Sequence, residues 1–267
     1  MESGLQVLTP GLDLTGFISS IAKAAERVLM LDYDGTLAPF HIRPEAAVPY
    51  PDAAACLADI IASGGTRVVV VSGRPAAELP PLLRLEPQPE IWGSHGWERL
   101  LPDGRRVVDE PAAEARRALA EAALAVRSVM PAGARLEEKL ASIALHWRGL
   151  PESAVARVDA DARQVWEPLA ADGKPLELLP FDGGVELRAY GCNKQYAVKT
   201  VLSQTGEDSA VAFLGDDITD EDAFRAVKPR GIAVLVRPQF RPTTADVWLR
   251  PPDELVGFMR HWRVQAS

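Results

Sequence analysis

Acidic and hydroxyl side chains follow three apolar runs of the sequence, in a pattern that favours phosphoryl-transfer chemistry. The segments after these runs are Asp32-Tyr33-Asp34-Gly35-Thr36, Ser72-Gly73-Arg74-Pro75 and Gly215-Asp216-Asp217-Ile218-Thr219-Asp220-Glu221-Asp222. Carboxylates that are packed together repel one another, so a cation must lie among them. Because these oxygen ligands have no histidine or cysteine nearby, they favour Mg²⁺ over Zn²⁺. A Mg²⁺ ion held by a few carboxylates keeps open positions that can receive a phosphate.

The residue types in these segments match the roles that phosphoryl transfer requires. Asp32 can attack phosphorus to give an acyl phosphate, which water then hydrolyses. Asp34 stands two residues further on, hence on the same side of an extended backbone, where it can protonate the leaving alcohol. Lys194, at the start of a predicted helix, is the cation expected to hold a phosphoryl oxygen and the nucleophile. Gly35 permits a turn that faces backbone N–H groups toward the phosphate, and Ser72 adds another donor.

The Ser72-Gly73-Arg74 segment is therefore our candidate for binding the phosphorylated end of a substrate. On its own, each of these segments has an ordinary structural explanation. Asp-x-Asp-Gly is common turn chemistry, Ser-Gly-Arg-Pro often caps a helix, and clustered acids suit a helix N-terminus. Their joint order along the chain, each at the end of a predicted element, favours the catalytic interpretation.

The elements that must position these residues are short apolar strands alternating with helices. Continuous runs rich in branched residues predict strands buried on both faces at 28–31, 68–71, 211–214 and 232–236. Helices are predicted at 52–63, 193–203 and 220–227. This alternation predicts a doubly wound, Rossmann-like α/β core with a parallel sheet, in which ligands bind beyond the carboxyl ends of the strands.

The middle of the chain follows a different pattern, which predicts an inserted α+β domain. Helices are predicted at 111–130 and 152–171, and strands at 135–140, 142–147, 176–179 and 185–188, with a hairpin turn at 181–184. We place this insert at 108–188 and the core at 1–107 and 189–267. Hinges are expected at 102–104 and 190–191.

Composition excludes several classes of protein. The formal net charge of −8 argues against a nucleic-acid partner, because phosphate backbones select basic surfaces. No apolar run approaches the ~20 residues that span a bilayer, and Met1 to Pro10 lacks the pattern of a secretory signal. The two cysteines, Cys56 and Cys192, have no metal-binding or disulfide spacing. We therefore expect a cytoplasmic protein without a membrane partner.

These motifs resemble those of the haloacid dehalogenase-like phosphatase superfamily and, within it, the trehalose-6-phosphate phosphatase family. The likeness covers nearly the whole chain. It rests on 32–36, Ser72, Lys194, 215–222, Gly93-Ser94-His95-Gly96-Trp97-Glu98, Glu138-Lys139, Ser142, His146-Trp147-Arg148 and 243–259. One departure is Gln195, which stands where the family prefers glycine.

The resemblance implies a Mg²⁺-dependent phosphatase that hydrolyses trehalose 6-phosphate through an aspartyl-phosphate intermediate. Its Mg²⁺ ligands would be Asp32, the Asp34 carbonyl and Asp216, with Asp217 and Asp220 supporting. The insert would be a mobile cap that closes over the sugar. The candidates for binding sugar hydroxyls are His95, Glu98, Glu138, Lys139, Arg148 and Glu186.

The residues leave several alternatives open. A phosphatase of another glycosyl phosphate, such as glucosylglycerol phosphate or sucrose phosphate, would carry the same core chemistry, and a phosphomutase could share the core residues. A non-catalytic regulatory module is disfavoured, because Asp32, Asp34, Lys194 and Asp216 are all present. The expected ligand is a small sugar phosphate. Functional pairing with a glycosyltransferase (a synthase) is compatible with the resemblance, and we expect a monomer or a weak dimer.

Overall fold

The computed structural model of the chain describes residues 5–191 and 193–263. It divides into two compact units. The first comprises Met1–Val107 and Lys194–Ser267, and the second comprises Val108–Asn193. Each unit is built around its own sheet.

The sheet of the first unit is largely parallel. Its strands, in spatial order, are β1 (Gln6–Val7), β13 (Val247–Leu249), β12 (Ile232–Val236), β11 (Ala210–Gly215), β2 (Arg27–Leu31), β3 (Arg67–Val71), β4 (Glu90–Gly93), β5 (Glu98–Leu100) and β6 (Arg106–Val108). The strands from β13 through β4 pair in parallel, whereas β1 and β5 pair antiparallel with their neighbours. The predicted α/β class with a parallel central sheet is confirmed.

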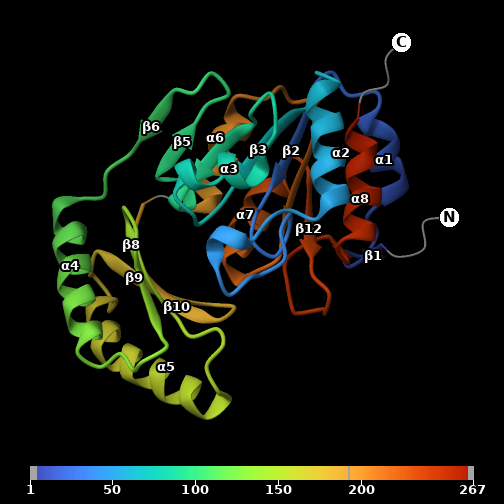
Figure 1. The fold of residues 1–267 in the computed structure, drawn as a ribbon. Coiled ribbons are helices and arrows are strands. Elements are labelled where there is room, and N and C mark those ends of the chain that lie inside the picture. Colours follow the sequence, from blue (N-terminus) through green and yellow to red (C-terminus); the bar gives the residue numbers. More distant parts are fainter. Residues whose placement is uncertain (1–4, 192, 264–267) are drawn as a thin grey trace. The chain divides into compact units, whose positions relative to one another are not determined.

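Helices cover both faces of this sheet because the strands are apolar on both sides. Leu29 and Leu31 of β2 pack into one core layer with α1 (Leu14–Ile21), α2 (Pro51–Ala62), α3 (Pro80–Leu83) and α8 (Asp253–Met259). Val28 and Met30 point to the other face, which α6 (Lys194–Ser203) and α7 (Glu221–Val227) cover. Figure 1 shows α1, α2 and α8 grouped on one side of the sheet. The alternation of side chains along each strand thus builds two hydrophobic layers.

The second unit is an antiparallel sheet with two helices. Its strands have the order β7 (Arg135–Glu138), β8 (Ser142–His146), β10 (Gly184–Ala189) and β9 (Leu176–Phe181), and its helices are α4 (Ala113–Arg127) and α5 (Glu152–Trp166). The helices pack on each other, and buried Trp166 donates from Nε1 to the Ala122 carbonyl at 3.1 Å. Helix α5 ends before the predicted residue 171, because Pro168 follows in a 3-10 turn and lacks the N–H that continues a helix.

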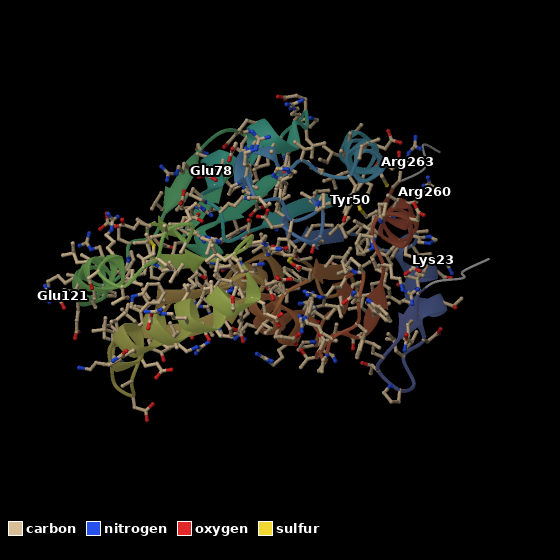
Figure 2. The ribbon with its side chains drawn as sticks, turned by 60° about the horizontal axis from the view of Figure 1, so that its bottom comes forward. Lys23, Tyr50, Glu78, Glu121, Arg260 and Arg263 are labelled. Carbon is tan, nitrogen blue, oxygen red and sulfur yellow. The ribbon has the colours of Figure 1, made fainter. Side chains whose placement is uncertain are left out.

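A surface ion pair joins Arg263, the last described residue, to helix α2. Arg263, labelled in Figure 2, lies beyond α8 with its Nη1 atom 3.4 Å from Asp59 Oδ2 of α2. Cys56 of α2 is a half-buried free cysteine, and Cys192 lies outside the described residues. Over residues 5–191 and 193–263, every helix is too short or too polar to cross a bilayer.

Candidate active site

The carboxyl ends of β2, β3 and β11 carry the residues singled out in the sequence. Asp32 follows β2 directly, and its N–H donates to the Leu214 carbonyl of β11 at 2.8 Å. Ser72 follows β3 and donates its N–H to Trp92 of β4 at 2.8 Å. Asp216 follows β11. All three side chains are buried. Because their strands pair in parallel, segments that are distant in the sequence meet at one edge of the sheet.

Three buried carboxylates form the centre of this edge. One oxygen from each of Asp32, Asp216 and Asp220 lies within 4.8 Å of the others. The buried Lys194 donates from Nζ to Asp32 Oδ1 and to Asp220 Oδ1, both at 2.6 Å. Lys194 therefore contacts Asp32, the residue that the sequence predicts as the nucleophile.

The electrostatics of this cluster leave an excess of negative charge. Burial raises the pKa of Asp32 to about 7, although Lys194 opposes the shift. Burial, followed by the charges of Asp32 and Asp220, raises the pKa of Asp216 well above its ordinary range. Burial favours deprotonation of Lys194, but the charges of Asp220 and Asp32 outweigh it and raise its pKa. Lys194 and Arg237, whose Nη1 lies 3.7 Å from Asp216 Oδ2, balance two of the three carboxylates.

Asp220 fixes the backbone conformation of residues 216–220, which we call the acidic loop. Its Oδ2 accepts from the backbone N–H groups of Asp216 and Asp217, each at 3.0 Å, and its Oδ1 accepts from Lys194. Both oxygens are therefore engaged. Asp217, predicted as a metal ligand, accepts from Ile218 N–H at 2.7 Å at the start of the 3-10 turn Ile218–Asp220, and it is not part of the three-carboxylate group.

The donor set fits Mg²⁺. Carboxylate oxygens are its preferred protein ligands, and no histidine or cysteine belongs to the group among the described residues. Asp216 Oδ2 is buried without a hydrogen-bond partner within the described parts of the chain. Because a buried carboxylate oxygen normally has a partner, this atom is suited to coordinate a cation. Asp32 and Asp216 would hold the ion.

The Asp34 carboxylate points to an arginine. Arg74 donates from Nε to Asp34 Oδ2 at 2.6 Å and from Nη2 to Asp34 Oδ1 at 2.7 Å. The guanidinium also lies over the Tyr33 ring, 5.5 Å from its centroid, and its Nη1 is 3.9 Å from Glu78, which Figure 2 labels. Arg74, predicted to bind substrate, thus holds the predicted acid/base in a two-point ion pair.

A strained turn supports the Ser72 segment. Ser94 and His95 both have positive φ angles, 49° and 57°, which are uncommon outside glycine. The two residues donate their N–H groups to the carbonyls of Arg74 and Ser72 at 2.7 and 2.9 Å. Ser94 also donates from Oγ to Glu98 Oε1 at 2.6 Å. The predicted residues His95 and Glu98 are both buried: His95 contacts the segment that is predicted to bind phosphate, and Glu98 contacts Ser94 of the same turn.

Gly73 is required where this turn meets the segment. A Cβ atom at Gly73 would lie 2.6 Å from the His95 ring, so the imidazole packs where a side chain would otherwise stand. The close approach explains the glycine between Ser72 and Arg74.

Replacing Gly35 with alanine is expected to lower kcat/KM for phosphate release by at least about 10²-fold, because small displacements of catalytic groups have large effects on rate. Gly35 has a φ of +88°, and its Cβ would lie 2.2 Å from Asp216 Oδ2. The new methyl group would push away the carboxylate that faces the expected ion. Steady-state assays at several Mg²⁺ concentrations measure the effect.

Gly64→Ala is the matched control for this change. Gly64 also has a positive φ, +72°, but a Cβ there meets nothing within 4 Å. Both variants share the backbone strain, so only Gly35→Ala adds the collision. Equal activity of the two variants would contradict the proposed placement of Asp216.

The second unit gathers another polar group on one face of its sheet. Glu186 of β10 accepts from Ser142 Oγ at 2.7 Å and from Lys139 Nζ at 3.3 Å. Glu137 of β7 lies 4.0 Å from Lys139 Nζ and 2.7 Å from His146 Nε2. Lys139 and Glu186, both predicted to bind substrate, are thus brought together.

Two other predicted residues of this unit lie elsewhere. Glu138 pairs with Arg127 of α4 and is half exposed. Arg148 donates to the Asp182 carbonyl in the β9–β10 turn. Because side chains alternate along β7, Glu137 and Lys139 share a face and Glu138 points to the other. Glu137 was not predicted from the sequence. Its position two residues before Lys139 in a predicted strand, hence on the same face, could have identified it.

The charge state of Glu137 is set by its neighbours. Burial opposes ionisation, but the His146 hydrogen bond and the Lys139 charge outweigh it and lower the pKa of Glu137 to about 2. Burial also lowers the pKa of His146, although Glu137 opposes that shift. At neutral pH this group therefore contains a carboxylate beside a neutral imidazole.

A family model and a curated relative both connect the chain to one family. Residues 30–249 match the family model described as trehalose-phosphatase. A trehalose-phosphate phosphatase of Mycobacterium ulcerans is 33% identical over 253 residues, which cover 90% of this chain and 62% of that protein. This chain therefore spans less than two thirds of that relative's length.

Solved structures share the fold along almost the whole chain. The C-terminal domain of a C. albicans trehalose-6-phosphate phosphatase aligns with a TM-score of 0.82 at 19% identity, covering 97% of this chain and 99% of that one. A trehalose-6-phosphate phosphatase of Aspergillus fumigatus aligns with a TM-score of 0.65 at 26% identity, covering 96% and 99%.

Proposed function

Because this chain belongs to the trehalose-phosphatase family, we propose that it hydrolyses trehalose 6-phosphate to trehalose and inorganic phosphate. The observation that carries this proposal is the buried group of Asp32, Asp216 and Asp220 around Lys194. The four residues come from three separate segments of the chain and supply a nucleophile, cation ligands and a fixed positive charge.

The reaction has two steps at phosphorus. An oxygen of Asp32 attacks, the bond between phosphorus and the sugar oxygen breaks, and Asp34 gives that oxygen its proton. Water then attacks the acyl phosphate, Asp34 takes a proton from the water, and cleavage of the bond to Asp32 restores the carboxylate. Arg74 donates to both Asp34 oxygens and so favours the ionised carboxylate; Asp34 therefore carries the proton of the first step only when this ion pair opens. Lys194 holds the Asp32 oxygen that does not react.

Bound Mg²⁺ would neutralise charge on the phosphoryl oxygens and the carboxylates. Asp32 and Asp216 are its expected ligands, with the Asp34 carbonyl from the resemblance. Asp217 remains a predicted ligand. Ser72 Oγ accepts from Arg74 N–H at 3.1 Å, so its own hydrogen is available to donate to a phosphoryl oxygen.

The second unit supplies the sugar specificity in this proposal. Its Lys139–Glu186 pair combines a donor and an acceptor, which is the combination that sugar hydroxyls require. Glu138 and Arg148 remain predicted contributors. Closure of this unit as a cap would exclude water during transfer.

A phosphate-release panel tests the function directly. Trehalose 6-phosphate should be preferred over glucosylglycerol phosphate, sucrose 6-phosphate and glucose 6-phosphate by more than about tenfold in kcat/KM, which is about 1.4 kcal/mol of transition-state binding. EDTA should stop release, and added Mg²⁺ should restore it.

The outcomes of this panel separate the substrate from the chemistry. Preference for another glycosyl phosphate would replace the substrate and keep the reaction. Failure to release phosphate from any of the four compounds in Mg²⁺ would overturn the proposal.

A further inference from the structure

The loop between β12 and β13 carries an arginine that binds the acidic loop from outside. Arg241 donates from Nε to the Asp216 carbonyl at 3.0 Å and from Nη2 to the Asp217 carbonyl at 2.6 Å. Its Nη1 donates to Glu221 and to the Pro242 carbonyl. The side chain is only 15% exposed. These bonds occupy Nε and both terminal nitrogens, so the guanidinium is committed to the protein itself.

Glu221 at the start of α7 anchors the same loop. Its carboxylate accepts from Thr243 Oγ1 at 2.8 Å, from Thr244 N–H at 2.8 Å and from Thr244 Oγ1 at 2.7 Å, in addition to Arg241. Burial opposes ionisation, but these hydrogen bonds outweigh it and lower the pKa of Glu221. A carboxylate with this many donors fixes the β12–β13 loop and therefore the Arg241 side chain.

The backbone of Asp216 and Asp217 is consequently held from both sides. Asp220 accepts their N–H groups, and Arg241 donates to their carbonyls. Between these two clamps lies Asp216, whose buried Oδ2 atom lacks a hydrogen-bond partner among the described residues. Arg237 also contacts this residue: its Nη1 lies 3.7 Å from Asp216 Oδ2 and donates to the Asp216 carbonyl at 3.4 Å, so the backbone and this long ion pair together set the direction of the side chain.

We propose that Arg241 is a positioning residue that fixes the Asp216 backbone and so directs Asp216 Oδ2 toward a divalent cation. This inference rests on the proposed function. Arg241 contacts neither the cation nor the substrate in this proposal and acts only through Asp216. Residues one shell removed from a metal commonly change its affinity by about 10- to 100-fold.

The sign of the effect distinguishes positioning from simple charge. Arg241→Gln removes a positive charge that repels Mg²⁺. Charge alone therefore predicts that this variant binds Mg²⁺ more tightly than the wild type. Positioning predicts the opposite, because the loss of both Arg241 bonds loosens the backbone of Asp216 and Asp217, which Arg237 holds more weakly through its 3.4 Å bond to the Asp216 carbonyl, and lets the Asp216 side chain rotate away. Arg225→Gln is the matched control, since Arg225 of α7 is half exposed and pairs with Asp222 at the surface.

The test is a Mg²⁺ titration followed by thermal unfolding of the full chain and, separately, by phosphate release. We expect Arg241→Gln to raise the half-maximal Mg²⁺ concentration about 10- to 100-fold in both assays, with a smaller loss in kcat at saturating Mg²⁺. Arg241→Lys, which keeps the charge but not the fork, should show an intermediate shift. Arg225→Gln should titrate like the wild type.

An unchanged or lowered Mg²⁺ midpoint in Arg241→Gln would refute the positioning role. If that variant does not fold in EDTA, the test uses Arg241→Lys and Glu221→Gln, because both substitutions weaken the same contacts. Mg²⁺ midpoints equal to the wild type in these two variants would also refute the positioning role. A wild type whose stability does not respond to Mg²⁺ would overturn the metal proposal and this inference together. A normal wild-type response with unshifted variants would overturn the inference alone.

Discussion

The Asp32→Asn variant is expected to lose at least about 10⁴-fold in kcat for phosphate release, in the range seen when enzymes lose a nucleophile. An amide cannot attack phosphorus or form the acyl phosphate. Because asparagine has nearly the same shape and removes one of three crowded carboxylates, the fold should persist. Release assays with trehalose 6-phosphate measure the loss, and thermal unfolding checks the fold.

Asp59→Asn is the control for this variant. Asp59 lies on α2, is mostly exposed and pairs with Arg263 at the surface. It should keep wild-type turnover. Near-normal turnover in a pure Asp32→Asn preparation would remove Asp32 from the nucleophile's role.

Replacing Lys194 with methionine should affect both catalysis and stability. The buried ammonium group contacts Asp32 and Asp220 at 2.6 Å, and its loss leaves carboxylates without their main counter-charge. Removing one partner of a buried ion pair costs about 3–5 kcal/mol. We expect a loss of this size in the free energy of unfolding, together with loss of phosphate release. Urea unfolding in EDTA measures the first.

Lys199→Met provides the comparison within the same helix. Lys199 is exposed on α6 and contacts Gln195. Its replacement should leave both quantities near their wild-type values. Equal stability of the two methionine variants would show that the Lys194 cluster does not carry the assigned electrostatic role.

The central site was predictable because buried parallel strands appear in a sequence as continuous apolar runs. Residues directly after such runs, including Asp32, Ser72 and Asp216, reach one edge of the sheet once the strands pair in parallel. Lys194 was predictable as the first residue of a helix that follows the insert. The short edge strands β1 and β6 were not predicted, since two or three residues carry no periodicity.

Contacts between loops could not be derived from the sequence. The pairing of Arg74 with Asp34 and the clamp of Arg241 on Asp216 depend on side-chain directions that no local pattern specifies. Glu137 is a different case. Glu138 was predicted from the family resemblance, whereas the alternation along β7 places Glu137 on the face of Lys139 and Glu138 on the other face. The proposed pairing with a glycosyltransferase remains a prediction.

The most direct test of the account is to trap the phosphorylated enzyme. Wild-type protein mixed with trehalose 6-phosphate and Mg²⁺ is quenched in acid within one turnover, reduced with borohydride and digested for mass spectrometry. We expect homoserine at position 32, formed from the acyl phosphate of Asp32, and none in Asp32→Asn. Phosphate released during that turnover without a covalent adduct, or an adduct on another residue, would contradict it.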